Sequence, residues 1–154
     1  MDGANPGSKL FTYRTRHRLS NDRDFQAVYD FKIRKAHGPL LVFIKPNSLP
    51  EHRLGLSVGR RVGNAVARGR VKRLLREAFR HERHALPIPD EGDHNTEPHA
   101  AYDIIVVARP HTPMPLSAYR ATLAELVARA HREHTRRTER QRSPEPPTER
   151  DGRA

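Results

Sequence analysis

The 154-residue chain carries a formal net charge of +11 and contains no cysteine. Its length suits a single domain, and the lack of cysteine excludes disulfides, thiolate catalysis and cysteine-ligated zinc. So large a basic excess predicts a polyanionic partner such as nucleic acid. No stretch reaches the ~20 apolar residues of a membrane-spanning helix and no N-terminal signal peptide is visible, so we expect a cytoplasmic protein with no membrane partner.

The composition divides the chain into one domain with two polar ends. Residues 1–9 are polar with Gly and Pro, and we expect a disordered leader there. Residues 10–135 hold the apolar segments and are expected to form a single domain, with an extended stretch at 10–19 and a polar loop at 87–101. Residues 136–154 are rich in Arg, Glu and Pro, which predicts a disordered charged tail.

The first helix is predicted over residues 24–31, because the Ser-Asn-Asp run at 20–22 supplies good N-cap residues. Phe25, Val28 and Tyr29 share one face of this helix. The pattern alone favours packing of all three side chains in the core.

Two strands follow this helix. Residues 32–38 are expected to close the helix and form a turn, and residues 39–44 form the first strand. A loop over residues 46–50 leads to the second strand at 53–58. Because the two strands are close in sequence, we expect them to pair as an antiparallel hairpin.

The most informative element is the helix that begins at Asn64 or Ala65, after a turn through Gly59 and Gly63. Its apolar residues fall on one arc at i, i+3, i+4 spacing, which predicts a core-facing stripe: Val71, Leu74, Leu75, Ala78 and Phe79. Its basic residues fall on and beside the adjoining arc: Arg68, Arg70, Lys72, Arg73, Arg76, Arg80 and Arg83.

Most charged helix faces are merely solvated, but this one differs from such faces in three ways. Arg68, Lys72 and Arg76 repeat one sign at i, i+4 spacing, which destabilises an isolated helix instead of pairing charges. Arginine dominates, and its planar fork of donors suits phosphate oxygens. Arg60 and Arg61 precede the helix, where its positive end adds to their field. The pattern therefore predicts a surface that binds a polyanion.

The C-terminal part supplies a strand and a helix. The near-continuous apolar run at 101–108 predicts a strand that is buried on both faces and central in its sheet. Ser117 is expected to cap a helix over residues 118–134. Together the elements predict an α/β fold, a small two-layer sandwich in which helices pack on a central mixed sheet.

The run from Arg60 to Arg80, RRVGNAVARGRVKRLLREAFR, resembles the signature of the bacterial ribonuclease P protein component. That signature is a Gly-rich turn followed by Arg-Asn-Arg, Lys-Arg and a further Arg on one helix, and this sequence matches most of it at the right spacing. Gly69 departs from it, because the family usually has Asn there. Glycine costs about 1 kcal/mol in a helix interior relative to alanine, so the first turn is expected to be looser.

The resemblance implies a fold, two binding surfaces and a function. It implies a left-handed strand–helix–strand crossover around the basic helix, although the general rule favours the opposite hand. It implies that the protein binds the catalytic ribonuclease P RNA subunit and the 5′ leader of precursor tRNA, assisting the endonucleolytic removal of that leader. The residues implied for the RNA subunit are Arg60, Arg61, Arg68, Arg70, Lys72, Arg73, Arg76 and Arg80. Those implied for the leader are Phe25 and Tyr29, with Arg34 and Lys35 as further candidates. For Phe25, packing in the core and binding of the leader are then equally good interpretations of its role.

The sequence nominates no catalytic site in the protein itself. The histidines at 81, 84, 94 and 99 fit no zinc pattern, and the carboxylates are too scattered for a two-metal nuclease. No nucleotide-binding motif or small-molecule site is visible, and we expect no metal bound by the protein alone. By the resemblance, the RNA subunit carries the chemistry with Mg²⁺. Two alternatives remain: a general binder of structured or ribosomal RNA, and, less favoured, a protein nuclease.

Overall fold

The computed structural model describes residues 15–89 and 101–142. The leader at 1–9, most of the loop at 87–101 and the tail beyond residue 142 lie outside these ranges. The elements are, in chain order, η2 (Thr15–His17), α1 (Asp22–Phe31), β1 (Arg34–His37), β2 (Leu40–Pro46), β3 (Arg53–Val58), η3 (Arg60–Val62), α2 (Ala65–Glu82), β4 (Tyr102–Ala108) and α3 (Leu116–Arg142). Within the described ranges no helix is long and apolar enough to cross a lipid bilayer.

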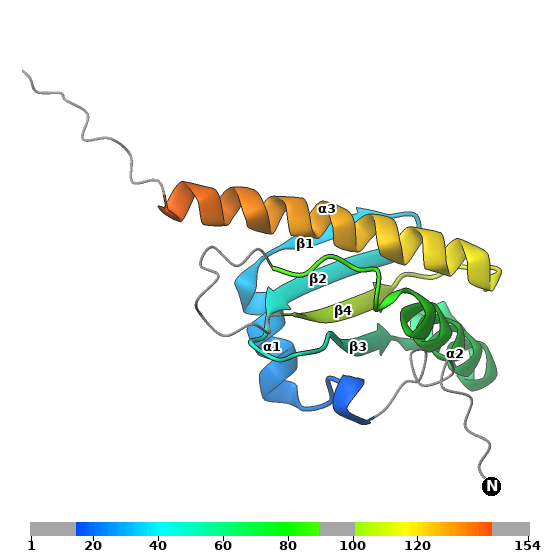
Figure 1. Cartoon of the computed structure of the whole chain (residues 1–154). Coiled ribbons are helices and arrows are strands. Elements are labelled where there is room, and N and C mark those ends of the chain that lie inside the picture. Colours follow the sequence, from blue (N-terminus) through cyan, green and yellow to red (C-terminus); the bar gives the residue numbers. More distant parts are fainter. Residues whose placement is uncertain (1–14, 90–100, 143–154) are drawn as a thin grey trace, which may run out of the picture.

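The four strands form one mixed sheet in the order β1-β2-β4-β3 (Figure 1). β2 is antiparallel to both β1 and β4, while β3 runs parallel to β4. The predicted hairpin of β2 with β3 is therefore wrong, because β4 lies between them. The predicted central position of β4 is confirmed, and six of its seven residues are buried. An almost wholly apolar strand is buried best with a neighbour on each side.

The prediction of a turn over residues 32–38 is wrong for Arg34–His37, which form the strand β1. It pairs with β2 through a tight turn at Gly38, whose φ of +58° suits glycine. The strand reads Arg-Lys-Ala-His, so it has none of the apolar alternation by which a strand is found in a sequence. A short, charged strand of this kind is typical of a sheet edge.

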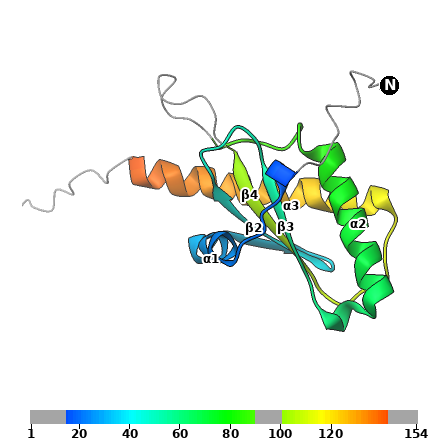
Figure 2. The ribbon, with the colours of Figure 1, turned by 90° about the horizontal axis from the view of Figure 1, so that it is seen from below.

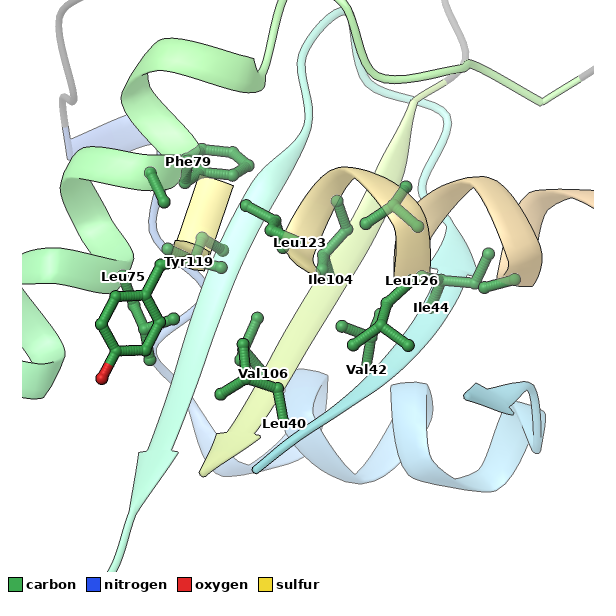
Figure 3. Close-up of a cluster of buried hydrophobic side chains, with 14 of the residues drawn as sticks. Leu40, Val42, Ile44, Leu75, Phe79, Ile104, Val106, Tyr119, Leu123 and Leu126 are labelled. Atoms are coloured by element: carbon green, nitrogen blue, oxygen red, sulfur yellow. The ribbon is translucent and has the colours of Figure 1, made fainter. Parts of the chain in front are cut away.

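Helices cover both faces of the sheet (Figures 1 and 2). α2 and α3 pack on one face, and their apolar side chains build the main core with Val42, Ile104 and Val106 of the sheet (Figure 3). α1 lies on the other face, where Val28 is fully buried against Leu19 and Ile105. The α/β class with a mixed sheet is confirmed, and α1 adds a third, partial layer that the two-layer prediction omits.

α2 begins where its sequence predicts and has the predicted buried face. Asn64 caps it by accepting a hydrogen bond from the backbone N–H of Ala67 at 2.8 Å. Four residues of the predicted stripe are buried, namely Val71, Leu75, Ala78 and Phe79, and Leu74 is half-buried. α2 connects the parallel neighbours β3 and β4, so the strand–helix–strand unit is present. The left-handedness of this crossover stays a prediction from the resemblance.

α3 is longer at both ends than predicted. It begins at Leu116, so Ser117 lies inside its first turn, and it continues to Arg142. The expected disorder from residue 136 is therefore wrong for residues 136–142. The reason is a tertiary contact: Arg137 donates hydrogen bonds to the backbone carbonyls of Phe31 at 2.7 Å and Lys32 at 3.1 Å. These are the carbonyls that the end of α1 leaves without a helical partner.

Candidate nucleic-acid interface

The cations of α2 and the preceding turn form a continuous basic surface. Of the eight predicted residues, Arg60, Arg61, Arg70 and Arg73 are exposed, and Arg68, Lys72, Arg76 and Arg80 are half-buried. Gly63, with a φ of +157°, turns the chain from η3 into α2. The Nε of Arg68 donates to the carbonyl of Gly63 at 3.2 Å, which braces this turn.

One of these cations is already paired. Arg80 bonds Glu77 with an Nη2–Oε1 distance of 2.7 Å, and the hydrogen bond to Glu77 raises the pKa of Arg80. Within the described residues, the other seven predicted cations have no carboxylate partner. The surface therefore keeps most of its positive charge available for an external anion.

A second surface is built from aromatic side chains between α1 and the sheet. The ring of Tyr29 packs edge-on against that of Phe43, with a centroid distance of 4.8 Å. The ring centroid of Phe25 lies 6.4 Å from that of Tyr29. We call Phe25, Tyr29 and Phe43 the aromatic cluster. All three side chains are half-buried, so the cluster belongs to the small core around Val28 and also reaches solvent.

The position of Phe25 depends on a glycine beneath it. A methyl group at Gly55 in β3 would lie 2.6 Å from Cζ of Phe25, which is closer than real Cβ atoms approach. Arg53, two residues before Gly55 and on the same face of β3, also holds α1. It pairs with Asp103 at 2.7 Å and lies 3.6 Å from Asp24 of α1. The sheet thus holds α1 so that the tip of the Phe25 ring lies against Gly55 of β3.

Phe25 of the aromatic cluster and the basic helix meet in one pocket of about 260 Å³. Phe25 of α1 lines it on one side, and Lys72 and Arg76 of α2 line it on the other. The other lining residues are Arg18, Leu19, Ser20, Leu54 and Leu56. We call this the α1–α2 pocket; it lies along β3, the edge strand of the sheet. The sequence predicted these residues as two separate surfaces, and the structure brings them together.

Arg18 is a pocket residue that the sequence analysis did not assign. It forms an isolated parallel bridge with Leu54, and the N–H of Leu19 donates to the carbonyl of Leu54 at 2.9 Å. This pairing adds the N-terminal segment to part of the β3 edge. The one sequence signal was the alternation of apolar and basic residues over 10–19, which predicted extended chain. That prediction is wrong at Thr15–His17, which form the 3-10 helix η2, and residues 10–14 lie outside the described ranges.

Glu51 anchors that N-terminal segment. Its carboxylate forms ion pairs with Arg16 at an N–O distance of 2.7 Å and with Arg83 at 3.1 Å. It also forms a hydrogen bond with the buried His17. Burial alone would raise the pKa of Glu51, but the bond from His17 and the two arginines lower it. Arg83, predicted on the basic arc, is 7% exposed and belongs to this anchor instead.

Arg34 and Lys35 lie on opposite faces of β1. Arg34 is exposed and pairs in register with Phe43, so it lies on the α1 side of the sheet beside the aromatic cluster. Lys35 pairs in register with Val42 and binds Glu133 of α3 at 2.7 Å on the other side. The structure therefore removes Lys35 from the predicted leader site, because its side chain faces away from Phe25 and Tyr29.

No group of three or more His, Cys, Asp or Glu side chains within residues 15–89 and 101–142 is placed to hold a metal ion. The histidines at 94 and 99 lie outside these ranges. Nε2 of His81 lies 3.7 Å from Oε1 of Glu77, the carboxylate that also pairs with Arg80.

A basic helix beside an aromatic pocket on a mixed sheet defines the class as a small RNA-binding α/β protein. The family model for ribonuclease P matches residues 13–131, which is most of the chain. The chain therefore belongs to the ribonuclease P protein component family, the protein subunits of a ribonucleoprotein endonuclease of tRNA processing. An RNA partner follows from this membership.

Relatives and solved structures agree with this assignment. The chain is 34% identical over 98 residues to the ribonuclease P protein component of Alkaliphilus metalliredigens, covering 64% of this chain and 78% of that protein. It is 42% identical over 94 residues to that of Pseudomonas aeruginosa, covering 60% of each. The Staphylococcus aureus RNase P protein superposes with a TM-score of 0.58 at 31% identity, covering 74% of this chain and 94% of that one. The Thermotoga maritima protein gives a TM-score of 0.59 at 26% identity, with 73% and 96% covered.

Proposed function

We propose that α2 and the preceding turn bind the ribonuclease P RNA subunit, while the α1–α2 pocket and the aromatic cluster bind the 5′ leader of precursor tRNA. The observation that carries this proposal is the pocket itself, in which Phe25 faces Lys72 and Arg76. A single-stranded nucleotide offers one group to each side: a base for the aromatic ring and a phosphate for the cations.

The basic surface suits a folded RNA. α2 has 18 residues and so spans about 27 Å. Arginine forks make paired hydrogen bonds to phosphate oxygens, and each neutralised phosphate releases counterions. Binding through this surface should therefore weaken steeply as salt is raised, with little dependence on RNA sequence.

The leader site suits an unpaired strand. Stacking of a base on an aromatic side chain contributes about 1–3 kcal/mol and tolerates any base. Mature tRNA has no leader, so this contact favours the precursor over the product and helps the product to leave. Arg34, on the same side of the sheet as Phe43, extends the positive charge past the cluster.

The RNA subunit is proposed to carry the chemistry with Mg²⁺ in the cytoplasm. The part of this chain is electrostatic: its cations lie between two RNAs that repel each other and so lower the Mg²⁺ concentration needed for their association. No protein side chain is given a role in bond cleavage.

The test is cleavage of a 5′-extended precursor tRNA at low Mg²⁺ by the host's ribonuclease P RNA alone, by the protein alone, and by both together. We expect cleavage at the mature 5′ end from the mixture only. Cleavage by the protein alone would place an active site in the chain. A mixture no better than the RNA alone would instead support a general RNA-binding role.

A further inference from the structure

The last turns of α3 lie beyond the part of the chain that matches the family. The family match ends at residue 131, but the helix continues to Arg142. Ala130 is the last fully buried residue of α3. Beyond it, the ring of His134 lies edge-on to the buried Tyr102, with a centroid distance of 5.7 Å, and its centroid is 5.9 Å from that of Phe31. Polar contacts add to this ring packing and keep the last turns folded against the domain.

Arg137 and Glu133 also anchor the extension. Arg137 bonds the carbonyls of Phe31 and Lys32 and places its guanidinium 5.2 Å from the centre of the Phe31 ring. Glu133 binds Lys35 of β1, and this bond lowers the pKa of Glu133, with smaller contributions from the positive charges of Arg136 and Arg137. The extension is therefore fixed beside the end of α1 and the start of β1.

The outer side of this extension carries a row of cations of one sign. Arg132, Arg136 and Arg140 repeat at i, i+4 spacing and are exposed. In the described part of the chain no carboxylate pairs with any of them. Glu139 of α3, between Arg136 and Arg140 in sequence, is an exposed acid. We call the three arginines the α3 stripe.

Such a row opposes helix formation, because like charges at i, i+4 repel. Arg137 and Glu133 hold the stripe in place despite this repulsion, so its three like charges keep a fixed arrangement. It spans about 12 Å along the helix axis. It also continues the positive charge of Lys32 and Arg34, which are exposed at the junction of α1 and β1.

We propose that the α3 stripe binds phosphates of the precursor's 5′ leader beyond the nucleotides held at the aromatic cluster. The leader is the favoured occupant because Arg34 pairs in register with Phe43 of that cluster, while Arg137 fixes the stripe beside Lys32. Arg34 and the anchor of the stripe thus both lie at the junction of α1 and β1. This inference rests on the proposed leader site.

The test measures binding of precursor tRNAs with short and long leaders to the reconstituted holoenzyme. The triple variant Arg132→Gln, Arg136→Gln, Arg140→Gln removes the charge and keeps helix propensity, since Gln and Arg are similar helix formers. The matched control changes the same three residues to Lys and keeps the charge. Thermal unfolding and circular dichroism of each free protein confirm that α3 is intact.

We expect the wild-type and Lys holoenzymes to bind the long leader more tightly than the short one, and the Gln holoenzyme to lose this difference. The log–log salt slope for the long leader should fall by about 2, because each single-strand phosphate contact contributes roughly 0.7. A short leader reaches the aromatic cluster but not the stripe, so its affinity tests the proposed leader site alone. If substitution of Phe25 and Tyr29 left the short-leader affinity unchanged, the proposed leader site would be refuted, independently of the stripe. An unchanged length effect in the Gln variant, or no length effect in the wild type, would overturn the stripe proposal. Weaker assembly with the RNA subunit at an unchanged length effect would also overturn it, in favour of the RNA subunit as the occupant.

Discussion

Substitution of Gly55 by alanine separates the two interpretations of Phe25, as a core residue or as a leader-binding ring. The new methyl group would lie 2.6 Å from Cζ and 3.0 Å from Cε2 of Phe25. The contact must relax, and the half-buried ring is freer to move than the backbone of β3. We therefore expect Phe25 to swing away from β3 and change the α1–α2 pocket that it lines.

The expected effects on stability and on binding differ in size. Overpacking costs about 1–3 kcal/mol, and a ring that can move toward solvent belongs at the lower end of this range. The alanine also reduces the entropy of the unfolded chain, which returns about 0.4–1 kcal/mol. The net loss of folding stability should thus be about 1 kcal/mol or less. A lost stacking contact, by comparison, costs about 1–3 kcal/mol of leader affinity, which is roughly fivefold or more in Kd.

The assay is the ratio of the Kd for mature tRNA to the Kd for precursor tRNA, measured with the holoenzyme, alongside urea unfolding of the free protein. Gly55→Ala should lower this ratio at least fivefold while the unfolding free energy changes little. The double variant with Phe25→Leu should show no further loss, because the ring is already displaced. A stability loss without any change in the ratio would refute the leader role of Phe25 and leave it as a core residue.

Three further substitutions test individual features of the structure. Lys32 ends α1 with a φ of +63°, so Lys32→Gly should raise the unfolding free energy by about 0.5–1 kcal/mol in urea titrations, and a lower value would contradict strain there. Gly69→Asn has room, since Nη1 of Arg73 would lie 3.6 Å from the new Cβ; RNA-subunit affinity in filter binding should be equal or tighter, and markedly weaker binding would disprove the view that glycine is a mild liability. His52 is buried, which lowers its pKa to about 4, while its Nδ1 accepts the N–H of Tyr102 at 3.0 Å. Its unfolded form takes up a proton near pH 6.5 and its folded form only near pH 4, so stability falls as the pH drops through this window, by up to roughly 3 kcal/mol. His52→Asn keeps an acceptor for Tyr102, and its stability curve between pH 7 and pH 4 should be flatter than that of the wild type; parallel curves would exclude this source of acid sensitivity.

The sequence predicted best what depends on local periodicity. The buried stripe of α2, its start at Asn64 or Ala65 and the central place of β4 all follow from patterns within single elements. The pairing of β3 was mispredicted because strand partners are set by the whole sheet, and closeness in sequence is a weak guide when an apolar strand such as β4 competes. β1 was missed because a charged edge strand has no apolar pattern to find.

The site was predicted as a set of residues but not as an arrangement. The position of Lys35 depends on the register of β1, so its pairing with Glu133 was invisible without that strand. The last turns of α3 depend on Arg137 reaching carbonyls at the end of α1, about a hundred residues away in sequence. Contacts of this range follow from the packing of elements, which composition does not encode.

The pocket also divides the basic surface of α2 into two flanks. Lys72 and Arg76 face the α1–α2 pocket, whereas Arg70 and Arg73 line the opposite flank with the exposed Val66. A helix whose cations all lay on one flank could approach a single phosphate backbone. With cations on both flanks, α2 can approach two phosphate backbones. In the proposed function these belong to the leader in the pocket and to the RNA subunit outside it. The repeated charges of α2, which disfavour the isolated helix, are then explained by its position between two polyanions.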